Sequence, residues 1–169
     1  MITLFSAMLF TGCMFAPPDC ADNLKRSSNG KCPYELDGRD TGSSTGSISI
    51  DVEADLTGAS LADTCNGDIA LSVVDNELTG IVSCKFNGPF DATLQGQTFE
   101  GSLNGTVDSS GMAEGDLELD LDVFGLLESG WSGTASSDHI DGEFVGTMQV
   151  PFGATEIPVA FAGSFTAAP

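Results

Sequence analysis

An alternation of apolar and polar residues runs almost without interruption from about residue 46 to Pro169. In the segment 47–56, every even-numbered position is apolar and every odd-numbered position is polar or acidic. Successive side chains of a β-strand point to opposite faces of a sheet, so a two-residue period predicts strands that each bury one face. No segment carries the period of an amphipathic helix over three turns. The sequence therefore predicts an all-β domain.

About nine strands are expected from this alternation and from the polar turns between its segments. They lie in 47–56, in both arms of a hairpin over 65–86, and in 90–94, 99–107, 114–123, 131–135, 140–150 and 157–165. Short turns between consecutive strands are typical of an antiparallel meander.

Glycines recur on the predicted inward face, beside large apolar residues. Gly101 and Gly105 flank Leu103, and Gly142 and Gly146 flank a phenylalanine. A glycine weakens a strand unless the strand must bend or another group must pack closely against it. Small closed barrels alternate large and small inward residues in this way. We therefore expect the meander to close into a small β-barrel, with a two-sheet β-sandwich as the alternative.

The N-terminal segment carries a second pattern, in which Cys13 follows an apolar stretch and the small residues Thr11 and Gly12. This pattern resembles the lipobox of bacterial lipoproteins, in which a diacylglycerol is attached to the cysteine thiol and the chain is cut just before it. The resemblance implies that residues 1–12 are a signal peptide and that Cys13 carries a lipid whose acyl chains include palmitate. The domain also looks similar to small surface-lipoprotein barrels, although no motif points to a specific family.

This resemblance implies an anchor in the bacterial cell envelope. In enterobacterial lipoproteins, an Asp directly after the lipidated cysteine retains the protein at the inner membrane. Here Met14 occupies that position, so the outer membrane is favoured. Signal peptides normally open with basic residues, and the first here is Lys25, so we expect the natural chain to begin upstream. Residues 13–45 are expected to form a lipid-anchored tether and residues 46–169 the acidic β-domain.

The remaining four cysteines are expected to form two disulfides, Cys20–Cys32 in the tether and Cys65–Cys84 in the domain. A hairpin that turns at Val74–Asp75 would place Cys65 directly opposite Cys84, whereas a register shift of two residues would separate the thiols. The alternative is a metal site, but no Cys-x-x-Cys pair occurs and the chain has a single histidine.

Charge restricts the partners of the β-domain. It carries 20 Asp and Glu residues against Lys85 alone, a net charge of −19. Like charges repel, so nucleic acid and anionic membrane surfaces are excluded as partners of the domain, and only the lipid is expected to contact a membrane. The carboxylates are interpreted as a solvated coat, with a cationic envelope partner or divalent cations as the functional alternative.

One acidic strand is a weak candidate for metal binding. It presents Asp116, Glu118, Asp120 and Asp122. Calcium needs six to eight oxygens, usually from a folded loop, and carboxylates two residues apart on a strand are nearly 7 Å apart. We therefore expect no metal or cofactor, apart from weakly bound Ca²⁺.

Catalytic motifs are not evident in the sequence. His139 lies beside Ser137 and Asp138, but neighbours in one turn do not make a Ser-His-Asp triad, which is defined by its geometry in space. We therefore expect no enzyme, although a hydrolase that works through two carboxylates stays open as a less favoured hypothesis.

The favoured function is a binding or structural module of the envelope, and the alternative is a lipocalin-like carrier of a small hydrophobic ligand. Barrels of eight strands leave room for one small ligand. Four aromatic residues are expected in the core or, in a carrier, against the ligand in the lumen: Trp131, Phe144, Phe161 and Phe165.

Overall fold

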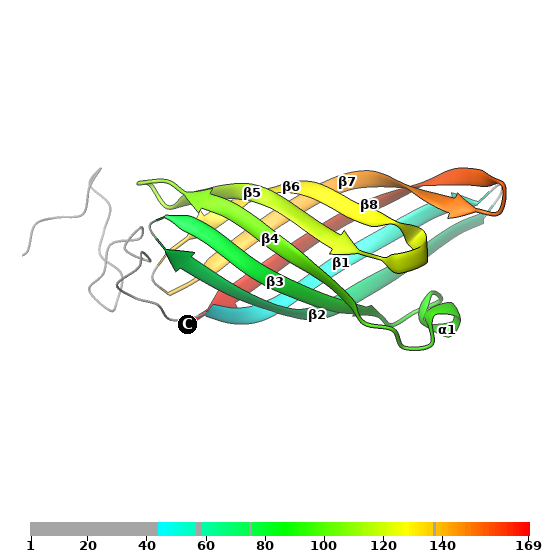
Figure 1. The fold of residues 1–169 in the computed structure, drawn as a ribbon, viewed down its shortest axis with the longest axis horizontal. Helices are drawn as coiled ribbons and strands as arrows, with labels where there is room; N and C mark the ends of the chain where they lie inside the picture. The colour runs from blue at the N-terminus through cyan, green and yellow to red at the C-terminus, as the bar shows by residue number, and fades with distance from the viewer. Residues whose placement is uncertain (1–43, 57–58, 75, 137) are drawn as a thin grey trace, which may run out of the picture.

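The computed structural model describes residues 44–56, 59–74, 76–136 and 138–169. Eight antiparallel strands follow one another around a closed barrel, and β8 pairs with β1 to complete it (Figure 1). This confirms the predicted all-β barrel and excludes the two-sheet sandwich. The strands are β1 (Ser44–Leu56), β2 (Ala59–Val74), β3 (Glu77–Phe86), β4 (Phe99–Val107), β5 (Met112–Asp120), β6 (Leu126–Ala135), β7 (Ile140–Phe152) and β8 (Thr155–Ala168).

The strand expected at 90–94 is wrong, because this segment forms the short helix α1 (Asp91–Leu94). Phe90 and Leu94 are four residues apart, so one face of a helical turn carries both. Both side chains are half-buried against the core. Two apolar residues at this spacing fit a strand and a helical turn equally well, which is why the alternation was misleading here.

The hairpin of β2 and β3 is predicted correctly, but its register is shifted by two residues. Val74 pairs with Glu77 beside the turn, so Cys65 pairs with Phe86, and Cys84 pairs with Gly67. The disulfide nevertheless forms between Cys65 and Cys84, with the Cα atoms 5.4 Å apart. The thiols meet diagonally across the ladder, so the expectation that this shift would separate them is also wrong.

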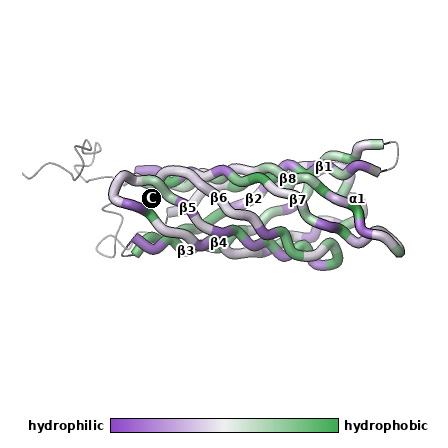
Figure 2. Tube along the Cα trace, turned by 90° about the horizontal axis from the view of Figure 1, so that it is seen from above, coloured by the Kyte–Doolittle hydropathy of each residue, from purple (hydrophilic) through white to green (hydrophobic). Residues whose placement is uncertain are grey.

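The core fills the inside of the barrel along its length. Most inward side chains are buried and apolar, with Ser44 and Asp63 as buried polar exceptions, while outward ones are mainly polar. The hydropathy along the strands alternates accordingly (Figure 2). The glycines lie on the inward face, as expected, and three of them stand opposite an aromatic residue of the paired strand. These pairs are Phe144 with Gly163, Phe161 with Gly146 and Phe165 with Gly142.

The two ends of the barrel differ. β6 pairs with β7 only over Trp131–Ala135, and beyond that point β7 pairs with β8 alone. Likewise, β2 pairs with β3 only from Cys65 onward. The strands β7, β8, β1 and β2 therefore extend past the other four at the end where α1 lies (Figure 1). Ser44 and the C-terminal end of β8 lie at the opposite end.

Candidate functional site: an apolar pocket at one mouth of the barrel

A pocket of about 330 Å³ lies at the end of the barrel where the four long strands extend. Every side chain that lines the pocket is apolar. The lining residues come from the β1–β2 and β7–β8 hairpins, from the end of β3, from the α1 segment, and from the short 3-10 helix η2 (Asp122–Phe124) with the residue before it. The lining residues are Val52, Ala54, Leu61, Phe86, Pro89, Phe90, Leu121, Phe124, Met148, Val150, Pro151, Ile157 and Val159.

The extension of the four strands explains why the pocket forms. Their inward face continues the apolar alternation past the point where β3 to β6 have ended, so no facing strand covers it. The end of β3 and the two connections on the other side supply aromatic side chains instead. The rings of Phe86 and Phe90 meet edge to face at 5.4 Å, and those of Phe90 and Phe124 are 6.4 Å apart. The pocket is the space between these rings and the long strands.

A buried carboxylate fixes the segment that closes one side of the pocket. Asp63 is only 7% exposed, and its Oδ2 accepts a hydrogen bond from the Phe90 backbone N–H at 2.7 Å. Its Oδ1 accepts one from the Thr64 N–H, also at 2.7 Å. A Cβ on Gly88 would lie 2.5 Å from that oxygen, so the close approach requires glycine. Asp63 thereby positions Pro89 and Phe90 over the pocket.

Polar contacts on the outside tie the same segment to its neighbours. The Lys85 Nζ lies 3.9 Å from Oδ1 of Asp91 at the start of α1. Gln97 Nε2 donates to Asp122 Oδ2 in η2 at 3.4 Å, which links the two connections that border the pocket. Lys85 is the only lysine or arginine after residue 39.

The four aromatic residues predicted for the lumen are all buried, and none of them lines the mouth pocket. Trp131 and Phe165 stack edge to face at 5.1 Å, and the Trp131 Nε1–H donates to the Asn104 carbonyl at 3.1 Å. Phe144 and Phe161 pack over glycines of the paired strands. These rings fill the middle of the barrel, and the pocket lies beyond them.

The acidic strand forms no metal cluster. Asp116, Glu118 and Asp120 project outward from β5 and are exposed, while Asp122 lies in η2. Across the residues that the structure describes, no group of three or more His, Cys, Asp or Glu side chains is placed to hold a metal ion. Several acids face one another instead, with Glu118 directly opposite Glu128 and a similar pair between β4 and β5.

His139 contacts the carboxylate of Asp141, whereas the sequence suggested that of its neighbour Asp138. Its Nε2 lies 3.1 Å from Asp141 Oδ1, which also accepts a hydrogen bond from the Thr134 hydroxyl at 2.8 Å. Its Nδ1 lies 3.5 Å from the Thr166 hydroxyl. The His139 and Asp141 side chains are about half exposed, on the outer surface at the end opposite the pocket. An exposed pair of this kind lacks the enclosed site that a triad needs.

A second, shallow groove of about 870 Å³ runs over the outer surface of β3 to β7. Its lining includes Gly130, an exposed position of β6 where the missing side chain leaves the backbone uncovered. Carboxylates border it, among them Glu114 and Glu143. The groove is open to solvent, and its two aromatic residues, Trp131 and Phe144, are buried beneath it.

The mouth residues were missed because the strand pattern does not mark them. The available signal was the presence of Pro89, Phe90 and Phe124 in connections, where polar residues are usual. The predictions for Cys13, Cys20 and Cys32 fall outside the described residues.

Comparison with known proteins gives no relative: no family model matches the chain, and no curated protein matches it. Within the described part of the chain, no helix has the length and apolar character needed to cross a membrane. The fold and the site define the class as an eight-stranded antiparallel barrel with an apolar pocket at one mouth.

Proposed function

We propose that this chain is a lipid-anchored binding module of the bacterial cell envelope, and that it takes a small apolar ligand at the mouth of the barrel without acting on it chemically. The observation that carries the proposal is the mouth pocket itself. Ligand sites are typically concave, preformed and lined by apolar and aromatic side chains. A pocket of about 330 Å³ with a wholly apolar lining meets that description.

The geometry also suits an anchored protein. Ser44, where β1 begins, lies at one end of the barrel, and the pocket lies at the other. A tether leading from a lipidated Cys13 would join the barrel at the end away from the mouth, so the ligand could enter without obstruction. Anchoring in the outer membrane is supported by the lipobox resemblance.

Binding of the fluorescent apolar probe N-phenylnaphthylamine tests the proposed site. Leu61→Trp should fill part of the pocket from β2 and weaken probe binding at least tenfold. Ile81→Trp is the matched control, because Ile81 is 70% exposed on the outer face of β3. Equal binding by both variants would place the probe elsewhere, and no binding by the wild-type protein would favour a purely structural module.

A further inference from the structure

The charges around the mouth pocket indicate which head group its ligand carries. Building on the proposed function, we infer that the pocket of about 330 Å³ selects a cationic amphiphile, with an apolar body inside the pocket and a positively charged head at the rim.

Nothing in the lining can hold a charged or polar head group inside the pocket, because all of the lining side chains are apolar. Burying an unpaired charge there would cost several kcal/mol. A head group must therefore remain at the rim, where the surrounding side chains decide its charge.

Carboxylates lie next to lining residues on four of the elements that form the mouth. Asp55 follows Ala54 at the end of β1, and Glu156 on β8 pairs directly with Pro151 of the lining. Asp91 follows Phe90, and Asp122 follows Leu121. The rim therefore carries acids from β1, β8, α1 and η2.

Lys85, the only lysine or arginine among the described residues, offsets only one of these acids. Lys85 lies 3.9 Å from Asp91 Oδ1, so its charge is already shared with a carboxylate. An anionic head group such as a fatty-acid carboxylate would meet only repulsion from the other rim residues.

Three probes with one tail length test this inference on the full mature chain: octyltrimethylammonium, octanol and octanoate at pH 7. Their affinities are measured by competition against bound N-phenylnaphthylamine. We expect octyltrimethylammonium to bind at least tenfold more tightly than octanoate, with octanol between them. The difference should shrink in 1 M NaCl, where the Debye length falls to about 3 Å.

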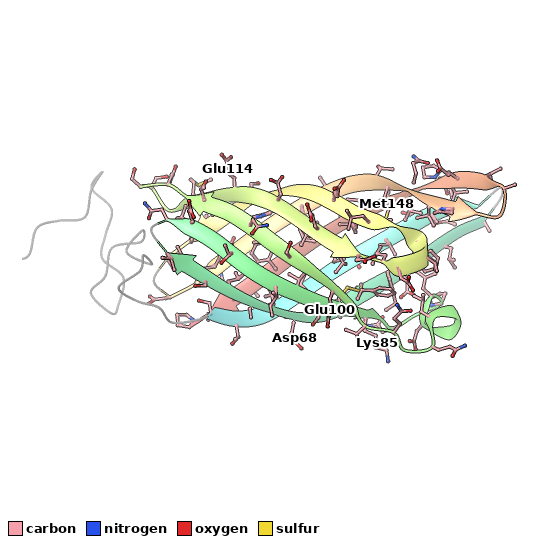
Figure 3. All side chains as sticks on the ribbon, viewed as in Figure 1. Asp68, Lys85, Glu100, Glu114 and Met148 are labelled. Carbon is pink, nitrogen blue, oxygen red and sulfur yellow. A yellow bond between two sulfur atoms is a disulfide. The ribbon has the colours of Figure 1, made fainter. Side chains whose placement is uncertain are left out.

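Two double variants, each of which removes two negative charges, test whether the rim acids cause the preference for the cationic probe. Asp55→Asn with Glu156→Gln should narrow the difference between the cationic and anionic probes severalfold. Asp68→Asn with Glu114→Gln should leave most of the difference, because these two exposed acids lie farther along the barrel wall, away from the mouth (Figure 3). Equal narrowing by both variants would contradict a rim site.

The outcomes separate this inference from the function on which it rests. Octanoate binding as tightly as octyltrimethylammonium would overturn the charge selectivity and leave the apolar site intact. Failure of N-phenylnaphthylamine and all three octyl probes to bind would instead overturn the proposed function.

Discussion

Phe144 on β7 stands directly opposite Gly163 on β8, and its ring occupies the space that a side chain at Gly163 would need. A Cβ built on Gly163 would lie 2.3 Å from Phe144 Cζ and 2.8 Å from the Ser49 carbonyl oxygen. The ring is buried, with 5% of its residue surface exposed, so it has little room to withdraw. The pair is the clearest case of the large-with-small packing that fills this barrel.

Gly163→Ala should therefore destabilise the protein by about 1–3 kcal/mol, the usual cost of overpacking a core. Chemical denaturation measures the change in the free energy of unfolding. Gly130→Ala is the matched control, because the nearest atom to a Cβ at Gly130 is 3.8 Å away. Phe144→Leu in the Gly163→Ala background should recover part of the loss, and strict additivity of the two changes would contradict the proposed contact.

The Cys65–Cys84 disulfide joins two strands across 19 residues of sequence. Replacing both cysteines with alanine should lower the free energy of unfolding by about 3 kcal/mol through the lost constraint on the unfolded chain. Peptide mapping without reductant checks the pairing, and also whether Cys20 bonds to Cys32. A Cys32–Cys65 peptide would contradict both predicted bonds.

The strand pattern was sufficient to predict the fold class, because a two-residue period requires one buried face whatever the neighbours are. The register of β2 against β3 needed the turn to be recognised. Asn76 has a φ of 67°, a left-handed conformation that Asn tolerates, and the chain reverses between Val74 and Glu77, which pair with each other. Placing the turn one residue earlier moved every cross-strand partner by two.

The mouth pocket could not have been predicted from the same period. It depends on how far each strand extends past its neighbours and on Asp63, whose role comes from a contact with Phe90, 27 residues later in the chain. Alternation carries no information about either. In the alternating pattern Asp63 occupies an inward position, and an acid there is a second sequence signal, besides the aromatic residues in connections, that this end of the barrel differs.

Asp63→Ala should release the segment that carries Pro89 and Phe90. Two backbone N–H groups would lose their acceptor, at a cost of about 1–3 kcal/mol for each one left buried and unsatisfied. Hydrogen exchange at the Phe90 amide should accelerate, and N-phenylnaphthylamine affinity should fall. Asp68→Ala, an exposed acid of the same strand, is the control. Unchanged exchange at Phe90 would show that Asp63 does not hold this segment.

Asp108 in the β4–β5 turn should titrate at unusually low pH. The Ser110 hydroxyl donates to Asp108 Oδ1 at 2.7 Å, and together with the Met112 and Ser110 backbone N–H groups it lowers the pKa of Asp108 below its ordinary value. Because the pKa is lowered in the folded protein, ionised Asp108 stabilises the fold at pH values above the ordinary Asp pKa. This stabilisation is lost as the pH falls through the lowered pKa. Ser110→Ala should raise the pKa of Asp108 in an NMR titration. An unchanged titration would rule out the hydroxyl as its main cause.

Glu118 on β5 lies directly opposite Glu128 on β6, and both side chains are exposed. Like charges directly opposite each other destabilise a sheet, so Glu118→Gln should raise the free energy of unfolding by about 0.2–1 kcal/mol. Glu114→Gln is the matched control on the same strand, because Glu114 faces Thr106 and Ser132 instead. Equal gains from the two variants would mean that overall charge, not this pair, causes the effect.

Salt provides the second half of the same test. At 1 M NaCl the Debye length falls to about 3 Å, so the gain in unfolding free energy from Glu118→Gln should largely disappear. The melting temperature of the wild-type protein should rise, because its net charge of −20 is screened. Melting curves in low salt, in 1 M NaCl and in 5 mM CaCl₂ at matched ionic strength separate screening from specific binding. Identical curves in all three conditions would contradict electrostatic repulsion as a destabilising force. A rise confined to calcium would instead mean that the outward carboxylates bind the ion.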